Sequence, residues 1–313
     1  TGDDSALPPG TATDLAGSPR IANDSVDMGA YEHQGAPPAP VTVTLSASKS
    51  PSALGEAVTL TAAASASDGT PGGTMTFLDG AHTLGTVTLD ATGAAAFSTD
   101  ALSRGSHTLT ALYGGDDDHR AGAAATLAHT VERAASTSVA SSTPNPSLYG
   151  LPVSLSATVT WARPELATPS GTVTFKANDT VLGASPLDGS GRATLSTSSL
   201  SVGWNTIRAE YGGDDNLAPS SDRFSQYVDR AGPVATLASS ANPSVYGQPV
   251  TFTATMAAPG AGTPSGTVSF SVGTGAPIAA TVDASGIASC TSSALPVGTH
   301  TISAAYGGDA VCR

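Results

Sequence analysis

The tetrapeptide Tyr-Gly-Gly-Asp occurs three times in this chain, and its tyrosines are 98 and 95 residues apart. The three copies are Tyr113-Gly114-Gly115-Asp116, Tyr211-Gly212-Gly213-Asp214 and Tyr306-Gly307-Gly308-Asp309. Further landmarks recur in the same order and with the same spacing: a glycine before an alternating stretch, a Gly-Thr-x-x-Phe stretch and an Asp-x-x-Gly. Self-similarity at a fixed period indicates an array of structural repeats.

Within each repeat, apolar residues occupy alternate positions, which is the pattern of half-buried β-strands. The predicted inward sets of the first repeat are Val58/Leu60/Ala62, Met75/Phe77 and Leu109/Ala111/Tyr113, and the last set of the third repeat is Ile302/Ala304/Tyr306. The Asp-x-x-Gly suits a hairpin loop whose glycine takes a positive φ. Helical periodicity is missing. The sequence predicts an all-β chain of three tandem immunoglobulin-like β-sandwiches.

Length and charge exclude several classes of protein. A chain of 313 residues suggests two or three domains. Its formal charge of −13, without a basic patch, argues against nucleic acid as a partner. No stretch of about 18 apolar residues exists, so we expect no membrane insertion of this segment. Nothing in the motifs implies a cofactor or a resident metal.

The repeats resemble the bacterial Ig-like repeat domains of secreted and surface proteins, whose last hairpin commonly carries a Tyr-(Gly/Ser)-Gly-Asp motif. The predicted repeats are residues 41–133, 134–230 and 231–313. The resemblance implies an extracellular stalk or adhesion module without catalysis. After Tyr306 only seven residues remain, against 20 and 19 after the corresponding tyrosines to the ends of the other repeats. The final strand of the third repeat is therefore expected to be missing, which leaves an unpaired edge.

The N-terminal residues belong to no repeat. The stretch DLAGSPRIANDSVDMGAYE (14–32) resembles the closing segment of secreted right-handed parallel β-helix (pectin-lyase-like) proteins. A lone coil cannot bury a solenoid face, so we expect residues 1–35 to be a loosely ordered C-terminal remnant of a β-helix domain. Residues 36–40 are expected to form a proline-rich linker.

The aspartate of the repeated motif allows two interpretations. In the first, the tyrosine packs in the core, Gly-Gly permits a tight reversal, and the aspartate accepts backbone N–H bonds in the turn. In the second, the aspartates bind calcium, which needs about six to eight converging oxygens. Asp116, Asp117 and Asp118 are consecutive, so their side chains diverge. Calcium at a domain junction, with Glu132 or Asp229, stays open as the alternative.

The two cysteines, Cys290 and Cys312, both lie in the third repeat. Cys290 occupies the inward position of Phe97 and Leu195, and Cys312 that of His119 and Leu217. Two changes that occur together in one copy suggest that the positions touch, so a structural disulfide is predicted. In the chain-entropy model this bond stabilises the fold by about 3 kcal/mol. The alternative is two buried free thiols.

Neither histidines nor tryptophans mark an active site. His107 and His300 share one position, but the second repeat has Asn205 there, which excludes a shared general base. Serines occur without a Gly-x-Ser-x-Gly elbow. Trp161 and Trp204 are the only candidates for stacking on sugar rings, but single surface aromatics are ordinary, so packing or chance is the favoured interpretation.

The leading functional hypothesis is a non-catalytic extracellular spacer that presents an upstream β-helix or tip domain in a bacterial secreted or surface protein. Each repeat would add roughly 30–40 Å, so that three form a monomeric rod on the order of 100 Å long. The alternative is an adhesin, or a carbohydrate-binding accessory module of a polysaccharide-active β-helix enzyme. Its partner would be an unidentified glycan or protein.

Overall fold

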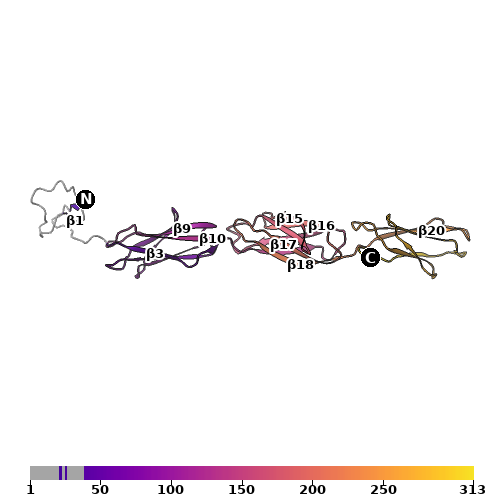
Figure 1. The fold of residues 1–313 in the computed structure, drawn as a ribbon, viewed down its shortest axis with the longest axis horizontal. Helices are drawn as coiled ribbons and strands as arrows, with labels where there is room; N and C mark the ends of the chain where they lie inside the picture. The colour runs from indigo at the N-terminus through magenta and orange to yellow at the C-terminus, as the bar shows by residue number, and fades with distance from the viewer. Residues whose placement is uncertain (1–20, 23–24, 27–38) are drawn as a thin grey trace, which may run out of the picture. The chain divides into compact units, whose positions relative to one another are not determined.

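The structure is a computed structural model that describes residues 21–22, 25–26 and 39–313. The described residues form strands, turns and loops, without a helix (Figure 1), which confirms the predicted all-β class. Accordingly, no described segment has the helical length and apolar character needed to cross a bilayer. The chain divides into two compact units, one ending at Glu132 and one beginning at Arg133. Each unit is described by itself.

The predicted β-helix remnant and linker fall largely outside the described residues. Of residues 1–38 the structure describes only two short strands, β1 (Ile21–Ala22) and β2 (Ser25–Val26). They pair antiparallel, with Ile21 opposite Val26. The assignment of this segment to a β-helix stays a prediction.

The first unit holds the first repeat, a sandwich of eight strands in two sheets. These are β3 (Thr42–Ala47), β4 (Ser52–Ala53), β5 (Val58–Ser65), β6 (Thr74–Asp79), β7 (His82–Thr88), β8 (Ala94–Thr99), β9 (Gly105–Tyr113) and β10 (Ala124–Glu132). One sheet has the order β3-β5-β8, and the other has the order β4-β10-β9-β6-β7. The pairing is antiparallel except between β4 and β10.

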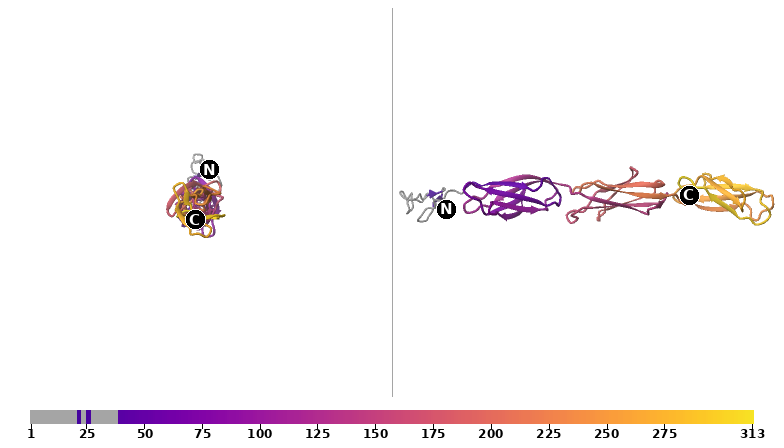
Figure 2. Two further views of the ribbon diagram at one scale, coloured as in Figure 1. Left: turned by 90° about the vertical axis from the view of Figure 1, so that its right-hand side faces the viewer. Right: turned by 90° about the horizontal axis from the view of Figure 1, so that it is seen from below.

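The second repeat, in the second unit, reproduces this topology. Its strands are β11 (Thr137–Thr143), β12 (Ser147–Leu148), β13 (Val153–Thr160), β14 (Thr172–Ala177), β15 (Thr180–Pro186), β16 (Arg192–Thr197), β17 (Gly203–Tyr211) and β18 (Ser220–Asp229). The sheets are β11-β13-β16 and β12-β18-β17-β14-β15. Strands within a repeat run side by side in two layers (Figure 2).

The third repeat has six strands within the described residues. They are β19 (Val234–Ser239), β20 (Val250–Ala257), β21 (Thr267–Val272), β22 (Ile278–Thr281), β23 (Ile287–Ser292) and β24 (Ile302–Tyr306). Its sheets are β19-β20-β23 and β22-β21-β24. Strands equivalent to β10 or β18, and to β4 or β12, are not formed among these residues. The second sheet therefore stops at β24.

The predicted inward residues form the cores of the first two repeats. Phe77 and Leu109, from one sheet of the first repeat, are fully buried against Val58 and Leu60 of the other sheet. Phe175, Ile207 and Leu155 occupy the same positions in the second repeat and are also fully buried. Side chains alternate between the two faces of each strand, so one apolar residue in every two is sufficient to build each layer.

The third repeat departs from the predicted pattern on β24. Ile302, Ala304 and Tyr306 are only half-buried, whereas their counterparts on β9 and β17 are buried. Among the described residues, no strand lies along the outer edge of β24, and the side chains near it border an open hollow of about 760 Å³ lined by residues that include Val250, Phe252 and Ile302. The burial of an alternating strand thus depends on its neighbours as well as on its own sequence.

Turn glycines behave as the sequence predicts. Gly93, Gly191 and Gly286, the last residues of the Asp-x-x-Gly stretches, have φ of 78°, 76° and 78°. In the second repeat the Asp188 carboxylate accepts hydrogen bonds from the N–H groups of Ser190 and Arg192 at 2.8 and 3.0 Å. Each hairpin is therefore closed by local chemistry.

Candidate functional site

The Tyr-Gly-Gly-Asp motif forms the turn that follows β9, β17 and β24. Tyr113 and Tyr211 end their strands with buried rings. The second glycine of each copy has a positive φ, 85° at Gly115, 80° at Gly213 and 81° at Gly308. A Cβ atom on Gly213 would lie 2.8 Å from the carbonyl oxygen of Leu217. Only glycine fits this position, because other residues resist a positive φ and a side chain would collide with the turn.

Each motif aspartate joins two turns. One Oδ atom of Asp214 accepts the N–H groups of Asn216 and Leu217 at 2.8 and 2.7 Å, which closes its own turn. The other Oδ atom accepts the N–H and the hydroxyl of Ser170 at 2.8 and 3.0 Å. Ser170 lies 44 residues earlier in the loop before β14.

The same arrangement recurs in the other repeats. Asp116 accepts the N–H of Gly72 at 2.6 Å, and Asp309 accepts the N–H of Ser265 at 2.8 Å, again over 44 residues. Both also accept N–H groups two and three residues ahead in their own turn. The turn interpretation of the motif is therefore confirmed, and the link to the distant loop is an addition that the sequence did not reveal.

The hydrogen bonds set the charge state of the aspartates. Burial alone would raise the pKa of Asp214, but the N–H groups of Ser170, Asn216 and Leu217 outweigh burial and hold the pKa below its usual range. Asp309 behaves in the same way, with its pKa held well below the usual range by the N–H groups of Ser265, Val311 and Cys312. Hydrogen bonds to a carboxylate favour its charged form.

Each tyrosine hydroxyl lies beside the loop that the aspartate holds. The Tyr306 hydroxyl donates to the carbonyl oxygen of Ser265 at 2.6 Å. The buried hydroxyls of Tyr113 and Tyr211 have no hydrogen-bond partner among the described residues. Burial, with the charge of Asp116, raises the pKa of Tyr113 to about 12, so the phenol stays neutral. Tyr113 and Tyr211 are core residues, whereas Tyr306 is half-buried and packs against the core of the third repeat.

Calcium gains no support from these aspartates. Among the described residues, no group of three or more His, Cys, Asp or Glu side chains is arranged to hold a metal ion. The two carboxylate oxygens of Asp116 are directed at N–H groups and at the His119 ring, whose Nδ1 lies 2.8 Å from one of them. Asp229, named as a junction ligand, forms an ion pair with Arg313 at 2.7 Å.

The predicted disulfide between Cys290 and Cys312 is wrong in this structure, where both cysteines are free. Cys290 lies opposite Phe252 on β20, whereas Cys312 packs with Ala231 and Ala258 beyond the end of β20. The six residue-to-residue steps from Phe252 to Ala258 span about 20 Å of strand, and a disulfide requires Cα atoms within about 7 Å.

The alignment that led to the disulfide prediction was nevertheless correct. Cys312 pairs with Ala231 as His119 pairs with Ala39 and Leu217 with Ala134. Likewise Cys290 pairs with Phe252 as Phe97 pairs with Leu60. The two aligned positions lie in different parts of each sandwich. Burial raises the pKa of both thiols, which makes them poor nucleophiles.

The shared histidine position has a structural role. The Nε2 atoms of His107 and His300 lie 2.7 Å from the carbonyl oxygens of Ser103 and Pro296, four residues earlier. The Asn205 amide donates to the carbonyl of Ser201 at the same distance and spacing. An imidazole and a carboxamide can both donate such a bond, which explains why either residue serves here.

The two tryptophans differ in exposure. Trp161 is buried and donates its indole N–H to the carbonyl of Ala167 at 2.7 Å, so it is removed from the sugar-stacking candidates. Trp204 is 71% exposed, and its ring lies against Tyr227 of β18 with centroids 4.9 Å apart. The second repeat therefore has a surface aromatic pair at the point where β17 pairs with β18.

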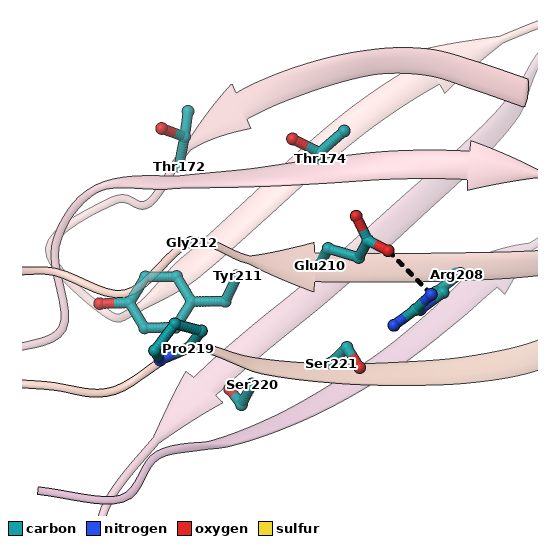
Figure 3. A pocket seen from close by; sticks show the side chains of 9 residues that line it. All are labelled: Thr172, Thr174, Arg208, Glu210, Tyr211, Gly212, Pro219, Ser220 and Ser221. Atoms are coloured by element: carbon teal, nitrogen blue, oxygen red, sulfur yellow. Dashed lines mark ion pairs between the residues drawn. The ribbon is translucent and has the colours of Figure 1, made fainter. Parts of the chain in front are cut away.

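Cations accompany this aromatic pair. We define the repeat-2 outer face by the outward side chains Lys176, Trp204, Arg208, Glu210, Arg223 and Tyr227. Glu210 forms ion pairs with Lys176 at 2.8 Å and with Arg208 at 3.0 Å. Figure 3 shows Arg208 and Glu210 on β17 between the threonines of β14 and the serines of β18. No local pattern in the sequence marks this group, although the outward positions of β14, β17 and β18 differ in residue type from their counterparts in the other repeats.

A sequence model of the bacterial Ig-like domain (group 3) matches residues 45–132, 140–229 and 237–313. No curated protein matches the chain.

Among solved structures, the chain is similar to a tetra-tandem repeat in the extending region of a large adhesion protein. The two are 19% identical, the match covers 86% of this chain and 74% of that chain, and the TM-score is 0.36. For an Escherichia coli adhesin the values are 15%, 87%, 94% and 0.28. For a bacterial ice-binding adhesin they are 16%, 81%, 87% and 0.29.

At these TM-scores the likeness to solved structures carries no conclusion about function, and the family assignment comes from the sequence match. That match covers all three repeats, each of which carries the Tyr-Gly-Gly-Asp turn described above. The chain belongs to the family of bacterial Ig-like domains (group 3), of which it contains three tandem copies.

Proposed function

We propose that the three repeats act as a non-catalytic spacer in an extracellular or surface-attached bacterial protein. On this proposal they present another module, and the β-helix resemblance of residues 14–32 names its type. The observation that carries the proposal is the shortness of the links between sandwiches.

Each link is a single residue, which lies between the last strand of one repeat and the first hydrogen-bonded residue of the next. β10 ends at Glu132, and the backbone of Ala134 already bonds to Asn216 and Ala218 of the second repeat. In the same way β18 ends at Asp229, and Ala231 bonds to Val311 and Arg313 of the third repeat. Only Arg133 and Arg230 lie between. A link this short prevents neighbouring domains from separating, whereas long flexible linkers allow independent tumbling.

Small-angle X-ray scattering of the full chain tests the spacer. A compact protein of this length has a radius of gyration of about 20 Å, whereas three sandwiches in series, each about 30–35 Å long, give a clearly larger value. Deletion of residues 134–230 is expected to shorten the maximum dimension by about the length of one sandwich. A radius near 20 Å for the full chain would contradict the proposal.

The alternative, an adhesive or carbohydrate-binding module, has support at one place. That place is the repeat-2 outer face, where the second repeat departs from the other two.

A further inference from the structure

We propose that the repeat-2 outer face binds an acidic glycan, meaning a sugar chain that carries carboxylate or sulfate groups. The proposal is independent of the spacer role, because a spacer needs no ligand and a binding face needs no particular length.

Equivalent surface positions of the three repeats carry different side chains. Because β9, β17 and β24 align through their tyrosines, Trp204 corresponds to Ser106 and Thr299, and Arg208 corresponds to Thr110 and Ser303. Lys176 corresponds to Leu78 and Ser271 by the same alignment. On β18, Arg223 and Tyr227 correspond to Thr126 and Thr130 of β10. The scaffold is shared, so the fold itself does not require aromatic or charged side chains at these positions.

Trp204 and Tyr227 form the aromatic part of the face. Trp204 and Tyr227 face each other across β17 and β18, and the tilt between their rings is 57°. Trp204 is 71% exposed, so most of its surface is available to a ligand. Rigid aromatic side chains give a large contact area at a low cost in conformational entropy. A sugar ring can stack its apolar C–H face on such a platform.

The face carries an excess of positive charge. The repeat-2 outer face has three cations and one carboxylate, whereas the whole chain has 12 Lys and Arg against 25 Asp and Glu. Arg223 is exposed and forms no ion pair within the described part of the chain. Guanidinium groups bind planar carboxylates and sulfate-like anions through paired N–H donors. The face is therefore an anion-attracting region on an acidic protein.

The surface of the sheet is hollowed beside the arginines of the face. Two shallow hollows of about 460 and 810 Å³ adjoin on this sheet and share Arg208 and Ser221 as lining residues. Hydroxyls of Thr172 and Thr174 border the first hollow (Figure 3). Asp179 and Asp222 border the second, but the Asp222 carboxylate is turned to the N–H of Ala140. Hydroxyls donate and accept hydrogen bonds, as sugar hydroxyls require.

A protein partner fits this face less well. The core of a stable protein interface is apolar and loses its charged residues, but here the aromatic pair is the only large apolar contact among the six residues of the face. The other four residues of the face are charged, and serine and threonine hydroxyls of β14, β17 and β18 border it. This composition matches a hydroxylated, charged and extended ligand.

Binding is tested on the full chain with three defined probes: polygalacturonate for carboxylates, heparin oligosaccharides for sulfates, and dextran as a neutral glycan. Both tryptophans of the chain lie in the second repeat and Trp161 is buried, so a change in tryptophan fluorescence on binding reports Trp204. We expect one acidic glycan to bind with a fluorescence change, and dextran to bind at least tenfold more weakly. Added salt should weaken the binding, as for other exposed charges.

The variants copy residues from the first repeat, so that they preserve the fold. Trp204→Ser and Arg223→Thr are each expected to lower the affinity for the acidic probe at least about tenfold, the size of effect typical of hot-spot residues. Isothermal titration calorimetry measures this for Trp204→Ser, whose fluorescence signal is lost. Arg192→Thr is the control. Arg192 is exposed on β16 in the other sheet, and its substitution removes the same charge as Arg223→Thr.

Several results would overturn the proposal. These are no binding of either acidic glycan at millimolar concentration, equal binding of dextran, or an equal loss of affinity with Arg192→Thr. Tighter binding of polyglutamate than of both acidic glycans, unaffected by Trp204→Ser, would instead assign the face to an acidic peptide. Unchanged melting temperatures of the variants show that any loss comes from the face.

Discussion

At the scale of residues, the motif aspartate is the group that links local to distant structure. Asp116, Asp214 and Asp309 each close their own turn and also hold a loop 44 residues earlier. A carboxylate has two oxygens that accept several N–H groups, and charge-assisted bonds are stronger than neutral ones. Aspartate at this position thus joins two loops at the same end of the sandwich, where the start of β14 pairs with the end of β17, and its role is structural.

Asp214→Asn is expected to lower the free energy of unfolding of the second repeat by about 1–3 kcal/mol, because the amide keeps one acceptor oxygen and loses the charge. Tryptophan fluorescence measures this, since both tryptophans lie in the second repeat. Asp116→Asn serves as the control and should leave the tryptophan transition in place. An unchanged transition for Asp214→Asn would contradict the role of Asp214 in holding the two turns together.

The same carboxylate gives the second repeat a dependence on acid. The folded-state pKa of Asp214 is lowered, so its stabilisation is present above the unfolded-state pKa of about 3.9 and is lost as the pH falls through the folded-state value. Asp188, whose pKa is also lowered by hydrogen bonds, adds to this loss. In Asp214→Asn the decline of the tryptophan-monitored midpoint below about pH 4 should be shallower than in the parent chain.

Gly213→Ala and Gly212→Ala form a matched pair in one motif. Gly213 has a φ of 80° and no room for a Cβ atom, whereas a Cβ atom on Gly212 would meet nothing within 4 Å. Gly213→Ala is expected to cost more than about 1 kcal/mol, and Gly212→Ala much less. Urea unfolding followed by tryptophan fluorescence compares them. Equal costs would contradict the assigned backbone strain.

At the scale of elements, β24 shows what a strand gains from its neighbours. Its sequence alternates like β9 and β17, yet its inward residues are only half-buried because no strand of the described part of the chain lies along its outer edge. An added neighbour supplies backbone hydrogen bonds and covers apolar side chains. The burial of β24 therefore depends on a neighbouring strand as well as on its own sequence.

Hydrogen–deuterium exchange tests this at the level of single strands. The amides of β24 are expected to exchange about tenfold faster or more than those of β17, because a strand with one free edge opens locally at a lower free energy. β9 is the internal control and should resemble β17. Equal protection of β24 and β17 would show that something else covers the edge.

At the scale of the whole molecule, the first and third repeats each have an apolar core of their own. The core around Phe77 and Leu109 contains only residues of the first repeat, and the core around Phe252 and Phe270 contains only residues of the third. Stability in a repeat array is approximately the sum of the units and of the terms between neighbours. The arrangement allows one copy to acquire new surface residues without disturbing the others.

Phe77→Ala in the first repeat tests this independence. Loss of a buried phenylalanine should cost that repeat about 3–5 kcal/mol, visible as an early transition by circular dichroism. The tryptophan-monitored free energy of unfolding of the second repeat should change by no more than about 0.5 kcal/mol, as for distant independent sites. A larger shift would show that the first two repeats unfold together.

The sequence by itself determined the number of repeats, the strand periodicity, the inward residues of the first two repeats and the turn glycines. These features follow from local rules: side chains alternate along a strand, and a positive φ selects glycine. A threefold repeat also allowed residues to be aligned across copies, as the pairing of Cys312 with Ala231 confirms.

Only the tertiary structure decided which aligned positions meet. Cys290 and Cys312 both replace other residues in the third repeat, yet they lie in different parts of the sandwich. That two residues change in the same repeat does not show how far apart they are. The bond from Asp214 to Ser170, the half-burial of Ile302 and the grouping of Trp204 with Tyr227 and Arg223 all depend on strand order and register. Those are set by packing between segments far apart in the chain, which no local pattern records.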